Sequence, residues 1–374
     1  MRLNLPVERS FNYSFLETGA VPGALANLVE EIGALRERVG WLKCLYPEVF
    51  GLLAKVARLE SVRASNALSG LTVPQTRLVE LGELGAAPLN EVEGEILGYL
   101  EAQDLISESF ETHDERIAHL LALHRTLFAR SQAKGGQFKK VDNHVAGYRV
   151  PGGLKTRLPA IPAEETTETL LRLIVANTLA AKSPGLNRLL LIPCFVLDFL
   201  RIYPFAKGNG RISRLLTRLL MFKSGYDVGR YVSLETGLAK SKADYLKSVR
   251  LAAIGWLEGA NSPFPFVEFF LKATLDGYRE LDRHFLAKNG QRASDAERVA
   301  EAIANNGGPI NRRGLTRLLP DLRAKTTAIL DQLIKEGKIA RHGKATGTTY
   351  GLPPKDQFAD LDPQSPEGLG LGCP

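Results

Sequence analysis

The chain has 374 residues, 44% hydrophobic and 24% charged, which excludes a fully disordered, collagenous or disulfide-scaffold protein and predicts two or three globular domains. Only 7% of the residues are aromatic, so the core depends on aliphatic side chains, a mix that favours a mostly α fold. Lys and Arg exceed Asp and Glu, 48 against 41, which makes a polyanionic partner (nucleic acid, nucleotide phosphate or anionic membrane) worth testing.

The sequence shows no targeting signal and no membrane span. Residues 1–22 lack the apolar core of a secretory signal, and the longest apolar run, Leu189–Leu197, is shorter than the ~20 residues of a membrane helix. The three cysteines are odd in number and lack metal-ligand spacing. We therefore expect a cytoplasmic protein without membrane association, without a disulfide framework and without a metal ligand set.

Hydrophobic periodicity predicts helices along most of the chain. Apolar residues recur every three or four positions in 23–68, 89–105, 117–128, 168–181, 187–200, 211–223, 240–258 and 265–289. The stretch 137–162 lacks this period and contains Gly and Pro, so it predicts a short β-hairpin or ordered flap. A polar segment at 288–294 predicts a domain boundary, and the Pro- and Gly-rich tail after Leu352 predicts disorder.

A Gly-rich turn between two apolar helices is the strongest candidate for chemistry. Gly208 and Gly210 allow successive backbone N–H groups to face one side, at the start of the next helix. Arg211 and Arg214 lie three apart, and Lys207 adds a third cation, so the turn predicts a phosphate site. The alternative is a plain connector followed by a solvated basic helix face.

The segment Tyr203-Pro-Phe-Ala-Lys-Gly-Asn-Gly-Arg-Ile-Ser-Arg214 resembles the motif of the Fic (Fido) family, His-Pro-Phe-x-(Asp/Glu)-Gly-Asn-Gly-Arg-x-x-Arg. Members of this family transfer AMP or other phosphate-containing groups to hydroxyl side chains. The resemblance implies a helical core with a flap that meets a protein partner, and ATP or another nucleotide as ligand. It implies nucleotide-binding roles for Lys207, Gly208, Asn209, Gly210, Arg211 and Arg214.

Two departures from the motif lie where the family's chemistry takes place. The family's His acts as general base, and Tyr203 in its position has a phenol with a pKa near 10, mostly protonated at pH 7. Lys207 replaces the acidic residue that would hold magnesium, and its ammonium repels the ion. We therefore expect nucleotide binding that does not require magnesium, with transfer weak or lost. Tyr203 as a simple packing aromatic remains an equal alternative.

A third departure concerns an inhibitory helix that many family members carry, Ser-x-x-x-Glu-Gly. The matching stretch runs from Ser65 to Gly70 and places Ser69 where the family has Glu. The resemblance implies that this Glu restrains the second motif arginine, here Arg214, which would lose that partner. Ser65 and Ser69 are thus candidate regulatory residues, and the alternative is that they are ordinary helix-surface residues.

The pattern of residues 291–352 resembles a winged helix-turn-helix domain, with three short helices and a two-stranded wing. This resemblance places Arg323, Lys325, Thr326 and Thr327 at the start of a recognition helix and Arg341, His342 and Lys344 on the wing. It implies contacts with duplex DNA, although a domain used only for protein contact or dimerisation stays open.

The sequence therefore predicts a mostly α protein with a helical region at 1–110, a Fic core at 111–288, a winged helix domain at 291–352 and a disordered tail at 353–374. The leading hypothesis is a nucleotide-binding Fic protein with weak or lost transfer. The alternatives are a DNA-binding regulator whose Fic domain is mainly a scaffold, and an active transferase with an altered mechanism. A protein partner at the flap and a homodimer are further expectations.

Overall fold

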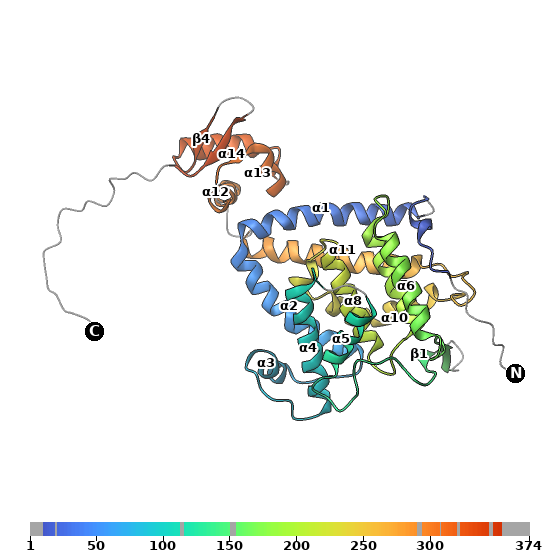
Figure 1. Cartoon of the computed structure of the whole chain (residues 1–374). Coiled ribbons are helices and arrows are strands. Elements are labelled where there is room, and N and C mark those ends of the chain that lie inside the picture. The colour runs from blue at the N-terminus through green and yellow to red at the C-terminus, as the bar shows by residue number, and fades with distance from the viewer. Residues whose placement is uncertain are drawn as a thin grey trace, which may run out of the picture. The chain divides into compact units, whose positions relative to one another are not determined.

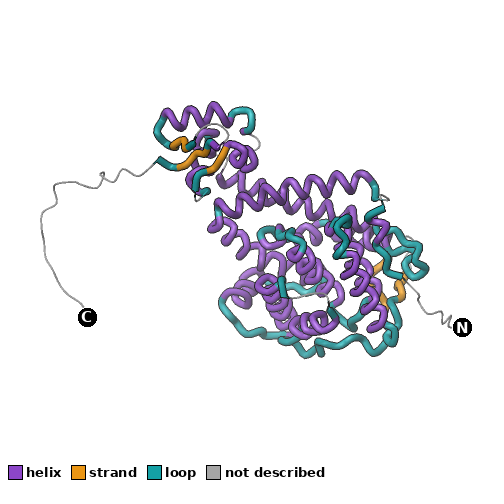
Figure 2. Tube along the Cα trace, turned by 45° about the horizontal axis from the view of Figure 1, so that its top comes forward, coloured by secondary structure: helices purple, strands orange, loops and turns teal. Residues whose placement is uncertain are grey.

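The structure is a computed structural model that describes residues 10–18, 21–112, 116–149, 155–289, 294–306, 308–319, 322–343 and 347–353. The prediction of a mostly α fold is confirmed, because the described residues form fourteen α-helices and five short strands (Figures 1 and 2). The chain divides into two compact units, Met1–Gly40 with Pro47–Phe285 and Trp41–Tyr46 with Leu286–Pro374. None of the described helices is long and apolar enough to span a lipid bilayer.

The helices of the first unit follow the hydrophobic periodicity closely. They are α1 (Gly23–Leu45), α2 (Pro47–Leu68), α3 (Gln75–Glu83), α4 (Glu91–Ser109), α5 (Ile117–Leu127), α6 (Thr166–Ala180), α7 (Arg188–Ile202), α8 (Asn209–Lys223), α9 (Leu234–Lys240), α10 (Lys242–Ala252) and α11 (Phe264–Asn289). Helix α3 was not predicted, because its short pattern rests on Leu78 and Leu81, both buried. The predicted helix 240–258 is shorter, since Gly255 adopts a positive φ of 72° after α10.

Helix α7 forms the centre of the first unit. All of its fifteen residues but Arg188 are buried, as an apolar run without a polar face predicts. Asn187 caps its N-terminus, accepting a hydrogen bond from the Leu189 N–H at 2.9 Å. The one buried carboxylate of the helix, Asp198, accepts hydrogen bonds from the Tyr13 hydroxyl (2.7 Å) and from Trp256 Nε1 (2.6 Å). Helices α6 and α8 pack against α7, which places the loop after α7 inside the unit.

A second set of contacts brings distant parts of the chain to the same loop. Helix α4 packs against α2, α5 and α8, and α2 also contacts α8 and α9. Asn90 caps α4 by accepting from the Glu93 N–H at 3.0 Å. The N-terminal half of α4 and the C-terminal end of α2 consequently lie beside the start of α8.

The predicted hairpin is present as strands β1 (His144–Arg149) and β2 (Lys155–Pro159). The two strands are antiparallel, with His144 opposite Pro159 and Arg149 opposite Lys155, and the register shifts between Val145 and Tyr148. The turn between them lies outside the described residues.

The second unit has helices α12 (Asp295–Asn305), α13 (Arg312–Leu318) and α14 (Thr326–Lys335) and strands β3 (Ile310–Asn311), β4 (Ala340–His342) and β5 (Thr349–Gly351). The strands form an antiparallel sheet in the order β3-β5-β4. Ser294 and Glu297 form a reciprocal capping box at the start of α12. Leu315, Leu330, Leu333 and Ile303 belong to one buried cluster that joins the three helices.

Two sequence expectations for the second unit need correction. The predicted recognition helix begins at Thr326, so Arg323 and Lys325 precede it, because 323–325 form a turn. The sheet contains a third strand, β3, whose two residues are too short to produce an alternating pattern. The predicted disordered tail, 353–374, lies outside the described residues except for Pro353.

Candidate functional site

Positive φ angles and side-chain hydrogen bonds define the backbone conformation of the loop between α7 and α8. Helix α7 is followed by its C-cap residue Tyr203, which adopts a left-handed conformation (φ 52°) that no other described non-glycine residue shares. Gly208 (φ 86°) precedes the first residue of α8. The Asn209 side chain accepts a hydrogen bond from the Phe205 N–H at 2.9 Å and donates one to the Phe205 carbonyl at 2.7 Å. This amide closes the loop on itself and explains why the position carries Asn.

The segment before β1 holds the same loop from outside. The Lys139 N–H donates to the Pro204 carbonyl at 2.9 Å, and Asn143 Nδ2 donates to the Phe205 carbonyl at 2.9 Å. Lys139 Nζ donates to Asn143 Oδ1 and to the Ile202 carbonyl. Burial lowers the pKa of the Lys139 ammonium to about 8. The loop is therefore supported by side chains that no sequence pattern singled out.

His124 on α5 completes this support. Its ring stacks on Phe205, with centroids 3.8 Å apart and an interplanar angle of 5°. Nδ1 accepts from the Gly136 N–H at 2.9 Å, so a neutral ring carries its proton on Nε2, which donates to the Lys207 carbonyl at 3.1 Å. Burial lowers the pKa of the His124 imidazole from 6.5 to about 4. His124 is thus a structural residue that fixes the carbonyl of Lys207.

We predict that His124 makes the fold sensitive to mild acid. The pKa of His124 is lower in the folded than in the unfolded protein. The contribution of the neutral His124 ring to folding stability is therefore complete above pH 6.5 and is lost as the pH falls toward 4. At about 1.36 kcal/mol per pH unit, the loss approaches about 3 kcal/mol. Urea unfolding at a series of pH values measures it, and His124→Phe should flatten the pH dependence. An imidazole that titrates near pH 6.5 by NMR would contradict this prediction.

Glu95 on α4 is a site residue that the sequence reasoning missed. Its carboxylate is 2% exposed and forms ion pairs with Lys207 Nζ and with Arg211 Nη2, the latter at 2.5 Å. Burial by itself raises the pKa of this carboxyl, but the hydrogen bonds from Lys207 and Arg211 outweigh it and hold the pKa below its usual value. A signal was present: Glu95, Tyr99 and Gln103 place buried polar groups at four-residue spacing on one face of α4.

The side chain of Arg211 is buried in the interior of the first unit. Its side chain is 2% exposed, Nη1 lies 3.5 Å from Asn66 Oδ1, and the guanidinium lies 5.2 Å from the centre of the Phe128 ring. Lys207 approaches the same ring at 5.8 Å, but its side chain is 55% exposed. The two predicted phosphate contacts therefore differ in access, with Lys207 facing the solvent and Arg211 paired to Glu95.

Arg214 has partners on the helix that the sequence marked as regulatory. Nε donates to Ser65 Oγ at 2.6 Å, and Nη2 donates to the Ser65 carbonyl at 2.8 Å and to Ser69 Oγ at 2.9 Å. The expectation that Arg214 would lack a restraining partner without Glu is therefore wrong. Two hydroxyls and a carbonyl hold it without neutralising its charge. Ser65 is buried and Ser69 is exposed at the end of α2.

The predicted loop residues line one cavity of about 550 Å³. Its lining includes Tyr203, Lys207, Gly208, Asn209, Gly210, Arg211, Arg214 and Ser69, together with residues of α10 such as Tyr245. Burial raises the pKa of the Tyr203 phenol, and a hydrogen bond with Asn209 opposes that shift only in part. The phenol is accordingly protonated at neutral pH. Backbone N–H groups at the start of α8 and the side chain of Lys207 give the cavity its positive character.

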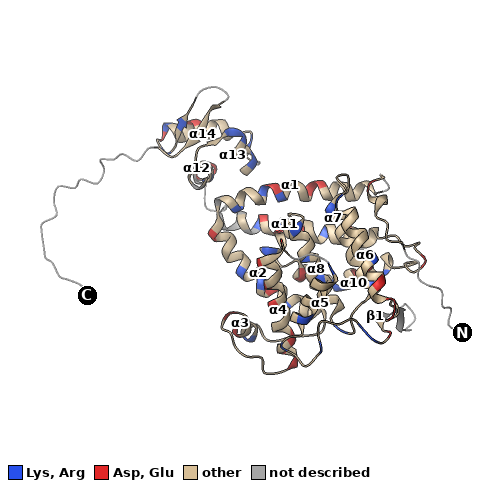
Figure 3. Cartoon of the chain, viewed as in Figure 1, with Lys and Arg blue, Asp and Glu red and all other residues tan. Residues whose placement is uncertain are grey.

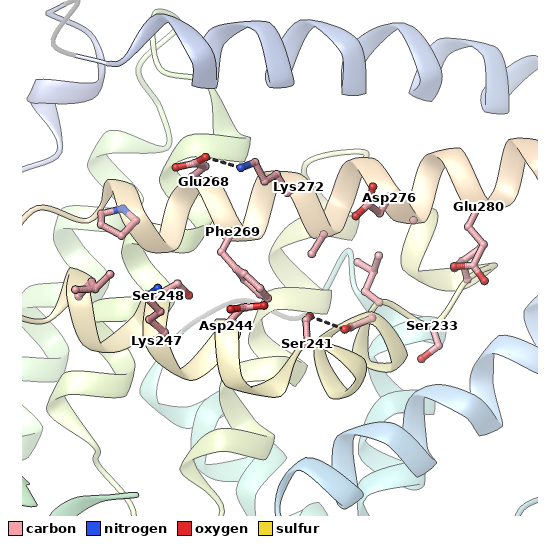
Figure 4. A pocket seen from close by; sticks show the side chains of 17 residues that line it. Ser233, Ser241, Asp244, Lys247, Ser248, Glu268, Phe269, Lys272, Asp276 and Glu280 are labelled. Carbon is pink, nitrogen blue, oxygen red and sulfur yellow. Dashed lines mark hydrogen bonds and ion pairs between the residues drawn. The ribbon is translucent and has the colours of Figure 1, made fainter. Parts of the chain in front are cut away.

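A second cavity, of about 570 Å³, lies between α9, α10 and α11 (Figure 4). Phe269 projects from α11 toward α10, and the labelled carboxylates are those of Asp244, Glu268, Asp276 and Glu280. Lys272 Nζ pairs with Glu268 at 2.6 Å. The sequence predictions include none of these residues.

The residues predicted to bind DNA all belong to the second unit. Arg323 and Lys325 are exposed in the turn before α14, Thr327 is exposed on α14, and Arg341 and His342 are exposed on β4. Thr326 needs correction, because it is 1% exposed and its hydroxyl donates to the Leu322 carbonyl at 2.8 Å. It is a core residue and cannot reach a base. Lys344 lies outside the described residues.

Comparison with known proteins finds a family domain within the first unit. The profile described as Fic/DOC family matches residues 114–221, which include the whole loop. Among curated proteins, none matches this chain.

Three solved structures share the fold. A Fic family protein from Desulfovibrio desulfuricans G20 is 23% identical, with a TM-score of 0.57 over 90% of this chain and 98% of that chain. A Fic domain containing signaling protein from Bacteroides thetaiotaomicron VPI-5482 is 19% identical, with a TM-score of 0.54 over 66% and 94%. A substituted form of Fic-1 from C. elegans is 19% identical, with a TM-score of 0.53 over 71% and 74%. The chain therefore carries a Fic/DOC family domain at residues 114–221, within a mostly helical fold.

Proposed function

We propose that the Fic/DOC domain binds a nucleotide in the cavity above the loop and transfers its phosphate-containing group weakly or not at all. The observation that carries this proposal is the convergence of Lys207, Arg214 and the N-terminus of α8 on one cavity of about 550 Å³. Family membership supports it, because Fic proteins generally transfer nucleotide-derived groups to proteins. A cavity of this size suits a nucleotide-sized ligand.

The anion-binding element is the start of α8. The first backbone bond of this helix runs from the Ile212 N–H to the Gly208 carbonyl at 2.9 Å, so the N–H groups of Asn209, Gly210 and Arg211 lie at its open end. These groups and the helix dipole favour a phosphate oxygen. Arg214 Nη1 lies 3.4 Å from the position that a Cβ on Gly210 would occupy, so the Arg214 guanidinium is beside this helix N-terminus.

The residues of this loop do not fit a magnesium ion. Lys207 occupies the position of the family's acidic residue, and its ammonium repels a divalent cation. Both oxygens of Glu95, the nearest carboxylate, are bonded to Lys207 and Arg211. Phosphate charge would be met by Lys207 itself, a compact cation on a flexible stem.

We expect ADP and ATP to bind without magnesium, and Lys207→Ala to weaken that binding by about tenfold, since a charge-assisted contact contributes roughly 1.5–3 kcal/mol before screening. Arg211→Ala should weaken binding at least as much, by releasing Glu95 into the site. Titration calorimetry measures both variants, with Lys272→Ala in the second cavity as a control. Affinity that is indifferent to Lys207 and Arg211 would leave the Fic domain as a scaffold, whereas affinity that depends on magnesium would contradict the role of Lys207.

A second candidate function is DNA binding by the second unit, which we propose to be a winged helix domain. The observation that favours it is charge: residues 308–343 contain eight Lys and Arg but three Asp and Glu. Figure 3 shows blue segments on α13 and α14, the helices that carry Arg312, Arg313, Arg317 and Lys335. Arg312 and Arg313, exposed at the start of α13, add to the exposed Arg323 and Arg341. Lys325 Nζ pairs with Asp295 at 3.0 Å, so its contribution is partly neutralised.

If this surface binds phosphate, log affinity for random duplex DNA should fall with log salt at about −0.9 per phosphate neutralised. Arg341→Ala should reduce that slope by about one and weaken all duplexes alike, whereas Arg323→Ala should mainly reduce preference among sequences. Fluorescence anisotropy at several salt concentrations measures both effects. Binding of random duplex at low salt no better than that of a neutral control protein would favour a docking role for the domain instead.

A further inference from the structure

Helix α6 (green in Figure 1) carries a row of exposed aliphatic side chains. Leu171, Val175 and Leu179 are 48%, 56% and 64% exposed and recur every four residues. The opposite face of the helix is buried, through residues such as Leu170, Leu173 and Ile174. Three large aliphatic residues aligned on one exposed helix face form a continuous apolar stripe, which is unusual on a surface without a partner.

The stripe is bounded by opposite charges at equal distances. Glu168 lies seven residues before Val175 and exposed Lys182 lies seven residues after it, while Leu171 and Leu179 lie four residues on either side. Seven residues make about two helical turns, so Glu168 is on the side of the stripe, and Lys182 follows in the turn two residues after Ala180, the last residue of α6. Glu168 has one weak ion pair within the helix, with Arg172 at 3.9 Å, and its side chain is 78% exposed.

We propose that α6 is a homodimer interface, in which the α6 helices of two copies pair antiparallel about a two-fold axis at Val175. In this register Leu171 faces Leu179 of the second copy, Val175 faces Val175, and Glu168 faces Lys182. A contact of this kind is isologous, with the same residues used by both copies. A second copy is the favoured occupant because an acid at one end and a base at the other match the same helix reversed.

The expected dimer is weak. One helix pair buries less than the roughly 1,200 Å² of a stable interface, so association should depend on concentration and have a dissociation constant of about 10–500 μM. Electrostatic complementarity sets the register of such a contact more than its strength.

Sedimentation equilibrium of the full chain over this range tests the proposal. Val175→Asp places two carboxylates at the axis and should weaken the dimer at least about 100-fold. The matched control is Val56→Asp on α2. Val56 is 58% exposed, nearly as much as Val175, and lies four residues after the exposed Leu52, so Val56→Asp should leave the dimer intact. A monomer throughout the range, or a dimer that Val175→Asp leaves unchanged, overturns the proposal.

Charge exchange and cross-linking test the register. Glu168→Lys and Lys182→Glu should each weaken the dimer about five- to tenfold, and the double variant should restore it, because each pair is then re-formed with reversed polarity. In a chain with Cys44→Ser and Cys373→Ser, Val175→Cys should form an intermolecular disulfide on mild oxidation. Leu171→Cys should cross-link efficiently only when mixed with Leu179→Cys. Equal cross-linking of Leu171→Cys with itself overturns the antiparallel register.

Discussion

Incubated with magnesium and ATP labelled in its α-phosphate, the unmodified protein is expected to transfer AMP about 10²–10⁴-fold more slowly than a variant that carries Tyr203→His and Lys207→Asp. The physical reason is the protonation state of position 203. Burial raises the pKa of the Tyr203 phenol, so at neutral pH it holds the proton that a general base must be free to accept. The measurement is label incorporated into the protein itself and into added cell protein.

Two further variants make this comparison decisive. Lys207→Asp would bring a new carboxylate beside Glu95, which now pairs with Lys207, so the double variant is compared with and without Glu95→Gln. Tyr203→Phe keeps the ring and removes the hydroxyl, and should match the unmodified protein. Efficient magnesium-dependent labelling that Tyr203→Phe abolishes would show that the phenol takes part in an altered transfer mechanism.

Glu95→Ala is expected to lower the free energy of unfolding of the first unit by about 3–5 kcal/mol, because it leaves the charge of Arg211 buried and uncompensated. Glu95 and Arg211 are each 2% exposed, so water cannot replace the lost partner without a rearrangement. Urea unfolding followed by Trp256 fluorescence, in a Trp41→Phe background, measures the loss. Trp256 is 1% exposed and packs within the same unit.

The control for Glu95→Ala is Glu268→Ala, which removes a surface ion pair with Lys272 and should cost about 1 kcal/mol or less. A second comparison replaces the pair itself. Glu95→Leu with Arg211→Met should recover much of the stability, since two apolar side chains leave no buried charge. If Glu95→Ala costs no more than Glu268→Ala, the ion pair does not hold the loop.

Glu95 also bears on how the loop accommodates three cationic side chains. The family's motif carries an acid at position 207, and a Lys there adds positive charge beside Arg211 and Arg214. The Glu95 carboxylate bonds both Lys207 and Arg211, so the added charge is balanced from α4. Only Lys207, which is 55% exposed, can turn toward a ligand without leaving Arg211 unpaired. Under the proposed function, this division leaves Lys207, Arg214 and the N-terminus of α8 to meet a phosphate while Arg211 stays paired to Glu95.

Local sequence was sufficient to predict most helices and the loop. The apolar residues of α7 predict a helix and the Gly208-Asn209-Gly210 segment predicts a turn. Both predictions need only neighbouring residues, because helical period and backbone freedom are local properties of the chain. The same reasoning misplaced the start of α14 and predicted that Thr326 contacts DNA. The sequence is the same whether the hydroxyl of a threonine near a helix start faces solvent or donates to the carbonyl four residues before it, as in Thr326.

The sequence by itself determined the mostly α fold, the Gly-rich turn before α8 and the tyrosine at position 203. The tertiary structure alone decided which charges meet. Glu95 lies 112 residues before Lys207, and Ser65 lies 149 residues before Arg214, so no local pattern could pair them. Burial selects such pairs, because a charge removed from water is stable only beside an opposite charge or a hydrogen-bond partner, and packing of α2 and α4 against α8 brings these groups together.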